Sequence, residues 1–182
     1  MDAWVWIVIA VVVAAVIVVV ALVALQRRRR SRLQGRFGPE YDRAVEGERR
    51  GRAERGLKDR VRRRDELEIR PLSSAARERY AAQWHELQAR FVDQPEQAVG
   101  EADVLVSEVM RERGYPVDDF EAQAELISVD HPHVVENYRT AHGTHVRQGE
   151  RRASTEDLRA AVVAYRSLFD ELLSDSEERV DG

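Results

Sequence analysis

The sequence contains no cysteine and only one lysine, Lys58, among its 29 basic residues. Without cysteine the chain forms no disulfide, offers no thiolate to a metal ion and has no cysteine nucleophile, which suits a reducing cytoplasm. The preference for arginine over lysine is typical of a GC-rich bacterial genome. The HExxH, nucleophile-elbow, dinucleotide-binding and Walker A motifs are also missing. We therefore expect a protein that is not an enzyme.

Charge is missing from one long stretch. Residues 3–25 read AWVWIVIAVVVAAVIVVVALVAL, without one charged side chain. As an α-helix this stretch is about 35 Å long, against roughly 30 Å for the hydrocarbon core of a bilayer. A cleavable signal peptide would need a positive n-region, a shorter apolar core and a small-residue cleavage site, and this segment lacks these features. The sequence therefore predicts an uncleaved transmembrane anchor in residues 1–25.

Basic residues flank this apolar segment on one side only. Met1 and Asp2 precede it, whereas five arginines follow it closely: Arg27, Arg28, Arg29, Arg30 and Arg32. The positive-inside rule places these arginines in the cytoplasm and the N-terminus outside, with Trp4 and Trp6 at the outer interface. We expect a single-pass protein of the bacterial plasma membrane. The arginines either set this topology alone or also bind anionic lipid head groups.

The charge beyond the anchor divides into two segments. Residues 26–70 hold 17 Arg and Lys against 9 Asp and Glu, a net of +8, and residues 71–182 hold 12 against 23, a net of −11. A basic neck thus joins the membrane to an acidic domain. Gly47, Gly51 and Gly56 each cost about 1 kcal/mol in a helix interior, so we expect the neck helix to be broken or frayed there. Acids are mixed with its arginines and aromatic residues are not interleaved, which predicts a solvated helical face rather than nucleic-acid binding.

The acidic domain contains five amphipathic segments with recognisable start and stop residues. The starts are predicted at Ser73 or Ser74, Pro95, Asp118 with Glu121, Asp130 with Pro132, and Ser154. Gly114 is expected to end the second segment in the left-handed conformation. The aromatic residues expected in the core are Trp84, Phe91, Tyr138, Tyr165 and Phe169. The pattern predicts an all-α protein: one transmembrane helix, a charged helical neck, a cytoplasmic bundle of about five helices in residues 71–173, and a flexible tail in residues 174–182.

Several sequence blocks carry a resemblance to known proteins. RFGPEYDRAV, IRPLS, RYAAQW, ARFVDQP, EVMRERGYP and SVDHPHVVENYRTAH occur in that order. Together they resemble a family of small, uncharacterised actinobacterial proteins, many of which carry one N-terminal hydrophobic segment. The resemblance covers about residues 36–173. It implies a bacterial membrane and a helical fold, and it assigns no activity, cofactor or functional residue.

Histidines form the one cluster in the sequence that could carry out chemistry or bind a metal ion. His131, His133, His142 and His145 lie within fifteen positions. His142 and His145 are three residues apart, so on a helix they are neighbours and form the candidate pair for a metal ion. Further ligands would have to come from residues that a straight helix does not bring to the same ion. We therefore assign no metal and no cofactor.

These features predict a non-enzymatic interaction or scaffold module at the cytoplasmic face of the membrane. Its expected partners are the lipid bilayer, anionic lipid head groups if the arginines bind them, and an unidentified protein. The alternative is a sensor domain that binds a metal or another ligand through His142 and His145.

Overall fold

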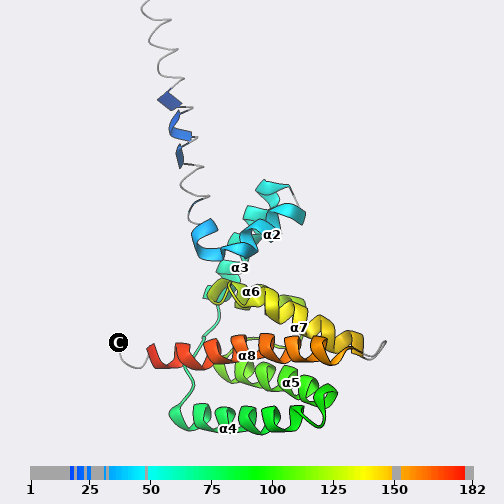
Figure 1. The fold of residues 1–182 in the computed structure, drawn as a ribbon. Helices are drawn as coiled ribbons and strands as arrows, with labels where there is room; N and C mark the ends of the chain where they lie inside the picture. The colour runs from blue at the N-terminus through cyan, green and yellow to red at the C-terminus, as the bar shows by residue number, and fades with distance from the viewer. Residues whose placement is uncertain are drawn as a thin grey trace, which may run out of the picture.

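The computed structural model describes residues 17–18, 20–22, 24–25, 31, 33–47, 49–148 and 153–178. All regular structure in these ranges is helical, which confirms the predicted all-α class (Figure 1). The helices are α2 (Pro39–Gly47), α3 (Arg50–Asp65), α4 (Ser74–Phe91), α5 (Pro95–Arg113), α6 (Phe120–Asp130), α7 (Val135–Gln148) and α8 (Thr155–Glu178). Helices α4 to α8 form the expected helical bundle, and α8 continues into residues predicted for the tail.

Three helix ends follow the local signals of the sequence. The side chain of Ser73 caps α4 by accepting a hydrogen bond of 3.1 Å from the backbone N–H three residues on. The Ser154 hydroxyl does the same at the start of α8, at 3.2 Å. Gly114 ends α5 with a φ of 99°. An added Cβ there would lie 2.6 Å from the carbonyl oxygen of Glu68, so both the conformation and the close approach require glycine.

Two predicted caps are wrong. Asp119, rather than Asp118, caps α6, because the chain stays extended for one residue more than expected. Asp130 is the last residue of α6 and does not cap α7. Its carboxylate instead accepts hydrogen bonds from the guanidinium of Arg64 and the hydroxyl of Tyr115. The contact with Arg64 pairs two ionised groups, whereas a cap would pair the carboxylate with a neutral backbone N–H.

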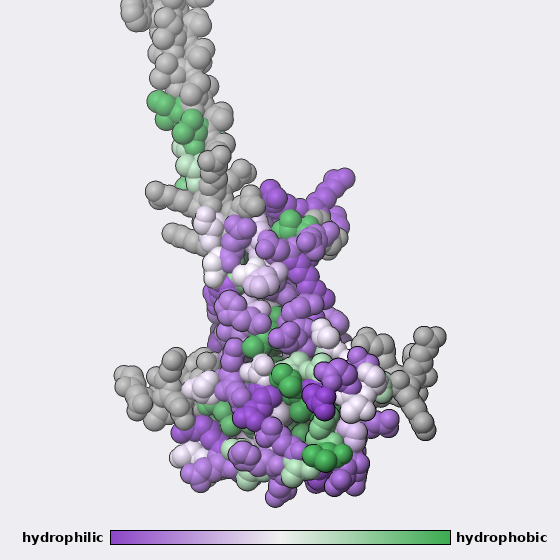
Figure 2. Space-filling model, in the orientation of Figure 1, coloured by the Kyte–Doolittle hydropathy of each residue, from purple (hydrophilic) through white to green (hydrophobic). Residues whose placement is uncertain are grey.

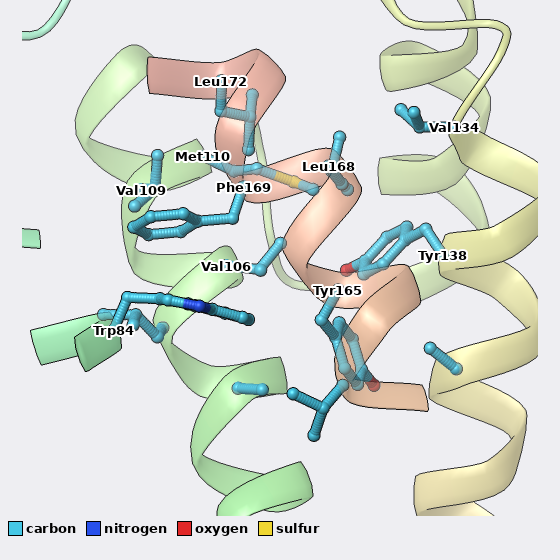
Figure 3. Close-up of a cluster of buried hydrophobic side chains, with 14 of the residues drawn as sticks. Trp84, Val106, Val109, Met110, Val134, Tyr138, Tyr165, Leu168, Phe169 and Leu172 are labelled. Atoms are coloured by element: carbon cyan, nitrogen blue, oxygen red, sulfur yellow. The ribbon is translucent and has the colours of Figure 1, made fainter. Parts of the chain in front are cut away.

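The main core lies where α8 packs between α5 and α7, with α4 on the other side of α5 (Figure 1). Trp84 stacks on Phe169 with ring centroids 4.7 Å apart, and Tyr138 meets Tyr165 edge-on at 5.9 Å (Figure 3). Aromatic pairs of this kind contribute about 0.5–1.5 kcal/mol each beyond the area they bury. These four residues are buried as predicted, whereas Phe91 is only partly buried.

The neck is folded against the bundle. Its helices α2 and α3 contact each other, and α3 packs on α6. A second, smaller core forms at this junction from Phe37, Tyr41 and Leu57 of the neck and Val129 of α6, all of which are buried. The neck and the bundle therefore share apolar contacts in addition to opposite charge.

The glycines of the neck act differently from one another. Gly47 ends α2 and α3 begins at Arg50, so the predicted break between Gly47 and Gly51 is present, but α3 runs unbroken through Gly56. The predicted interruption at Gly56 is wrong. Helix α3 buries Ala53 and Leu57, and tertiary packing of this face outweighs a glycine cost of about 1 kcal/mol.

The predicted anchor falls mostly outside the described residues, as do Trp4 and Trp6. Near its end Ile17, Leu22 and Leu25 are helical and more than half exposed. In Figure 2 the described part of this segment is hydrophobic and lies above the largely hydrophilic neck. Within the described ranges, none of the helices combines the length and hydrophobicity that a membrane crossing requires.

Candidate functional site

His142 and His145 lie one turn apart on α7, with their ring centroids 6.4 Å apart. Nδ1 of His142 is 3.0 Å from Oδ1 of Asp103 on α5, and its ring stacks on Phe120 at 3.6 Å between centroids. The same Asp103 oxygen accepts a hydrogen bond of 2.8 Å from the hydroxyl of Tyr165 on α8. One largely buried carboxylate therefore joins α5, α7 and α8.

The surroundings of Asp103 and Tyr165 fix which of the two donates and which accepts the hydrogen bond between them. Burial alone would raise the pKa of Asp103, but hydrogen bonds from His142 and Tyr165 outweigh it and hold the pKa below its usual range. Burial raises the pKa of Tyr165, and the neighbouring Asp103 charge raises it further. Near neutral pH Asp103 is thus an ionised carboxylate that accepts hydrogen bonds, and Tyr165 is a neutral hydroxyl that donates one to it.

The two other histidines of the sequence cluster lie elsewhere. Nδ1 of His131 is 2.8 Å from a carboxylate oxygen of Glu171 on α8. His133 lies beside the neck, where a Cβ added to Gly38 would be 3.6 Å from its ring. The four histidines that are close in sequence therefore do not converge on one point.

His145 has a different environment from His142. Its ring packs on Gly100 of α5, where an added Cβ would lie 3.2 Å from Cε1, and its buried Nδ1 has no hydrogen-bond partner. Among the residues that the structure describes, no three His, Asp or Glu side chains are grouped so that they could hold a metal ion. The structure thus brings the candidate pair His142 and His145 near Asp103 without completing a metal site.

Glu40 of α2 connects the neck to the bundle. Its side chain is only 3% exposed and accepts a hydrogen bond of 3.0 Å from Arg60 of α3. It also accepts two, of 2.7 and 3.0 Å, from the two terminal nitrogens of Arg139 on α7. Bidentate arginine–carboxylate pairs are among the strongest hydrogen-bonded contacts in proteins. We refer to Glu40, Arg60 and Arg139 as the Glu40 network.

Further ion pairs extend this contact along α3. Arg60 also binds Glu125 of α6 at 3.1 Å, and Arg63 binds the other oxygen of that carboxylate at 2.7 Å. Arg64 donates to both oxygens of Asp130, at 2.9 and 2.7 Å. The prediction of a solvated arginine face is therefore wrong at Arg60 and Arg64, whose side chains are 18% and 15% exposed. The basic neck pairs with acids of the bundle.

An open cavity of about 700 Å³ lies beside the Glu40 network, between α2, α3 and α6. Its lining consists mainly of arginine and acidic residues, together with Ala44, Ala53, Gly56 and Leu57. The arginines predicted to set topology or bind lipid (Arg27, Arg28, Arg29, Arg30 and Arg32) lie outside the described residues.

The sequence interpretation missed Asp103 and Glu40, for different reasons. Asp103 shares a helix face with the buried residues Val99, Val106 and Met110. An acidic residue at such a core position indicates a buried polar contact, and this could have been noticed in the sequence. Glu40 has no such signal, because its partner Arg139 lies 99 positions away.

Comparisons with protein-family models, with curated proteins and with solved structures find no match to this chain. The resemblance to actinobacterial proteins stays a prediction, and the function has to be argued from the geometry of the chain itself.

Proposed function

We propose that this protein is a single-pass protein of the bacterial plasma membrane that holds an acidic helical bundle at the cytoplasmic face and binds a partner protein there without catalysis. The observation that carries this proposal is the Glu40 network. It connects α2 and α3 to α7, so these two neck helices are packed on the bundle. A neck that is packed in this way would hold a binding surface near the membrane.

The anchor is supported by the sequence and by the described residues at its end. Residues 3–25 are uncharged, and Leu22 and Leu25, which the structure describes, are helical and more than half exposed. Exposed leucines within an uncharged stretch of this length favour burial in lipid. The following arginines favour a cytoplasmic bundle.

A groove of about 500 Å³ between α4 and α5 is the best-placed surface for a protein partner. Val104 at this groove is 57% exposed, and the side chains of Leu87 and Leu105 also line it. Glu86 and Glu108 contribute negative charge to the same lining. The groove therefore fits a partner segment that presents an apolar side chain between basic residues, because opposite charge guides association and apolar burial stabilises it.

Photo-crosslinking in the native host tests this proposal. A photoreactive amino acid placed at Val104 of the full chain should give one discrete adduct with another protein. The double variant Glu86→Gln/Glu108→Gln should lose this adduct. The charge-matched control Glu78→Gln/Glu156→Gln, outside the groove, should keep it. Absence of any discrete adduct, or equal loss in both double variants, would contradict a specific groove.

The orientation is tested separately. A reporter that works only in the cytoplasm should be active when fused after Gly182. Replacing the five arginines that follow the anchor with glutamine should give mixed orientations. A wild-type C-terminus that protease can reach from outside the cell would reject the topology.

A second candidate function is metal or ligand sensing by the histidine pair. The specific observation in its favour is the buried Nδ1 of His145, which lacks a hydrogen-bond partner and lies near the Asp103–His142 pair. Metal analysis of the full chain purified without chelator tests it. Stoichiometric metal that is lost in His145→Gln would favour sensing, and metal-free, folded protein would leave the partner-binding function.

A further inference from the structure

The cavity beside the Glu40 network has an excess of positive charge. Six arginines line it: Arg43, Arg52, Arg60, Arg62, Arg63 and Arg139. Four carboxylates line it with them, which leaves a net charge of +2. The arginines come from α2, α3 and α7, so helices distant in sequence bring them around one space.

The carboxylates in this cavity do not satisfy all of the arginines. Glu40 is taken by Arg60 and Arg139, and the two oxygens of Glu125 are taken by Arg60 and Arg63. Within the described part of the chain the Arg52 side chain has no carboxylate partner.

Arg62 makes only long ion pairs. Its side chain is 71% exposed and lies 3.8 Å from Asp59 and 4.0 Å from Glu66, at the outer limit of an ion pair. The guanidinium groups of Arg52 and Arg62 are therefore free to turn toward a bound anion.

A second observation concerns Arg139, which also lines the cavity. The Arg139 side chain is only 8% exposed, and its Nε is buried without a hydrogen-bond partner. A buried N–H without an acceptor is unfavourable. The guanidinium of Arg139 thus keeps one donor that its carboxylate partners do not satisfy.

We propose that this cavity binds a phosphate group, carried either by a lipid head group or by a soluble phosphorylated molecule. Guanidinium groups match the oxygens of phosphate in geometry and charge, and several arginines from different helices bind it better than one. The cavity volume suits a head group or a small phosphorylated molecule. The acids in the lining disfavour a long polyanion such as nucleic acid. This site goes beyond the proposed partner binding and does not depend on it.

The test uses the full chain in nanodiscs of phosphatidylcholine. Inorganic pyrophosphate is titrated by calorimetry at low salt, because screening weakens such contacts. In parallel, hydrogen exchange of α3 is compared between these nanodiscs and nanodiscs that contain phosphatidylglycerol. The variant Arg52→Gln/Arg62→Gln changes exposed side chains and leaves the Glu40 network intact. The control Arg159→Gln/Arg166→Gln removes the same charge from α8, outside the cavity.

We expect saturable binding of pyrophosphate that weakens at least tenfold in Arg52→Gln/Arg62→Gln and less than twofold in the control. Binding of pyrophosphate without protection by phosphatidylglycerol identifies a soluble ligand. Protection of α3 by phosphatidylglycerol that the cavity variant alone abolishes, without pyrophosphate binding, identifies a lipid head group. Absence of both effects, or equal weakening in the control, overturns the proposal. Tighter binding of a hexaglutamate peptide than of pyrophosphate also overturns it, in favour of an acidic protein segment.

Discussion

Glu40→Gln is the sharpest test of how the neck is held on the bundle. The substitution keeps the shape of the side chain and removes its charge. The Glu40 side chain is 3% exposed, and it balances Arg139 at 8% and Arg60 at 18% exposure. In the variant, the amide offers one oxygen instead of two and directs an NH₂ group toward guanidinium donors. Arg139 therefore loses its bidentate carboxylate partner, and Arg60 loses one of its two carboxylate partners.

Breaking a buried ion pair by removing one partner costs about 3–5 kcal/mol. The lower end applies here, because Arg60 keeps its contact with Glu125 at 3.1 Å. A cost of about 3 kcal/mol corresponds to a roughly hundredfold larger fraction of molecules in which the neck is detached.

Hydrogen exchange of the full chain in nanodiscs measures this fraction by segment. In Glu40→Gln, the amides of α3 should exchange about a hundredfold faster than in wild type, while those of α5 should be unchanged. The control is Glu136→Gln. Glu136 is 57% exposed and 3.5–3.6 Å from Arg43 and Arg139, so its loss should cost no more than about 0.5 kcal/mol.

Two results would refute this reasoning. Unchanged exchange in α3 would mean that the Glu40 network does not hold the neck. Equal acceleration in α3 and α5 would mean that the neck and bundle unfold as one unit. The double variant Glu40→Gln/Arg139→Gln gives an internal check, because removing both partners should be less costly than the sum of the single changes.

Three further predictions concern the bundle and the neck, each measured by urea unfolding of the full chain. Trp84→Ala should lower the free energy of unfolding by about 3–5 kcal/mol, whereas Val163→Ala, at an exposed position, should change it little; similar effects would contradict the core assignment. Asp103 has a lowered pKa in the folded state, so it contributes stability above its unfolded pKa of about 3.9, and this is lost as the pH falls through the folded value. Asp103→Asn should therefore reduce the loss of stability between about pH 5 and pH 2, and an unchanged acid profile would argue against the lowered pKa. Gly114→Ala should destabilise by more than about 1 kcal/mol, whereas Gly56→Ala, in a helix with open space around it, should stabilise by about 0.5–1 kcal/mol; the opposite order would show that the two backbones are misassigned.

Local signals predicted much of the bundle. Ser73 and Ser154 act as caps and Gly114 as a left-handed stop, because each works through backbone groups within three or four residues. The stripe that contains Trp84 is buried for the same reason: helical periodicity alone decides which face is apolar. The cap predicted at Asp118 is wrong because the next residue, Asp119, caps α6. The cap predicted at Asp130 is wrong because its carboxylate binds Arg64 and Tyr115.

The candidate sites could be predicted only in part. The spacing of His142 and His145 correctly places them on neighbouring turns of α7. Asp103, the partner of His142, lies on another helix, and its position depends on how α5 and α7 pack. Nothing local to Glu40 indicates that it would be buried between two arginines, because isolated glutamates are usually solvated.

The sequence by itself determined the helical class, most helix ends and the opposite charges of neck and bundle, because these follow from composition and from interactions within one or two helical turns. The tertiary structure decided that α3 runs through Gly51 and Gly56 and that the neck packs on α6. It also decided which acid binds which arginine. Glu40 and Arg139 are 99 positions apart, and their pairing depends on apolar packing of the neck against Val129 of α6, the helix that contacts α7. Long-range partners are set by that packing, which no local pattern in the chain encodes.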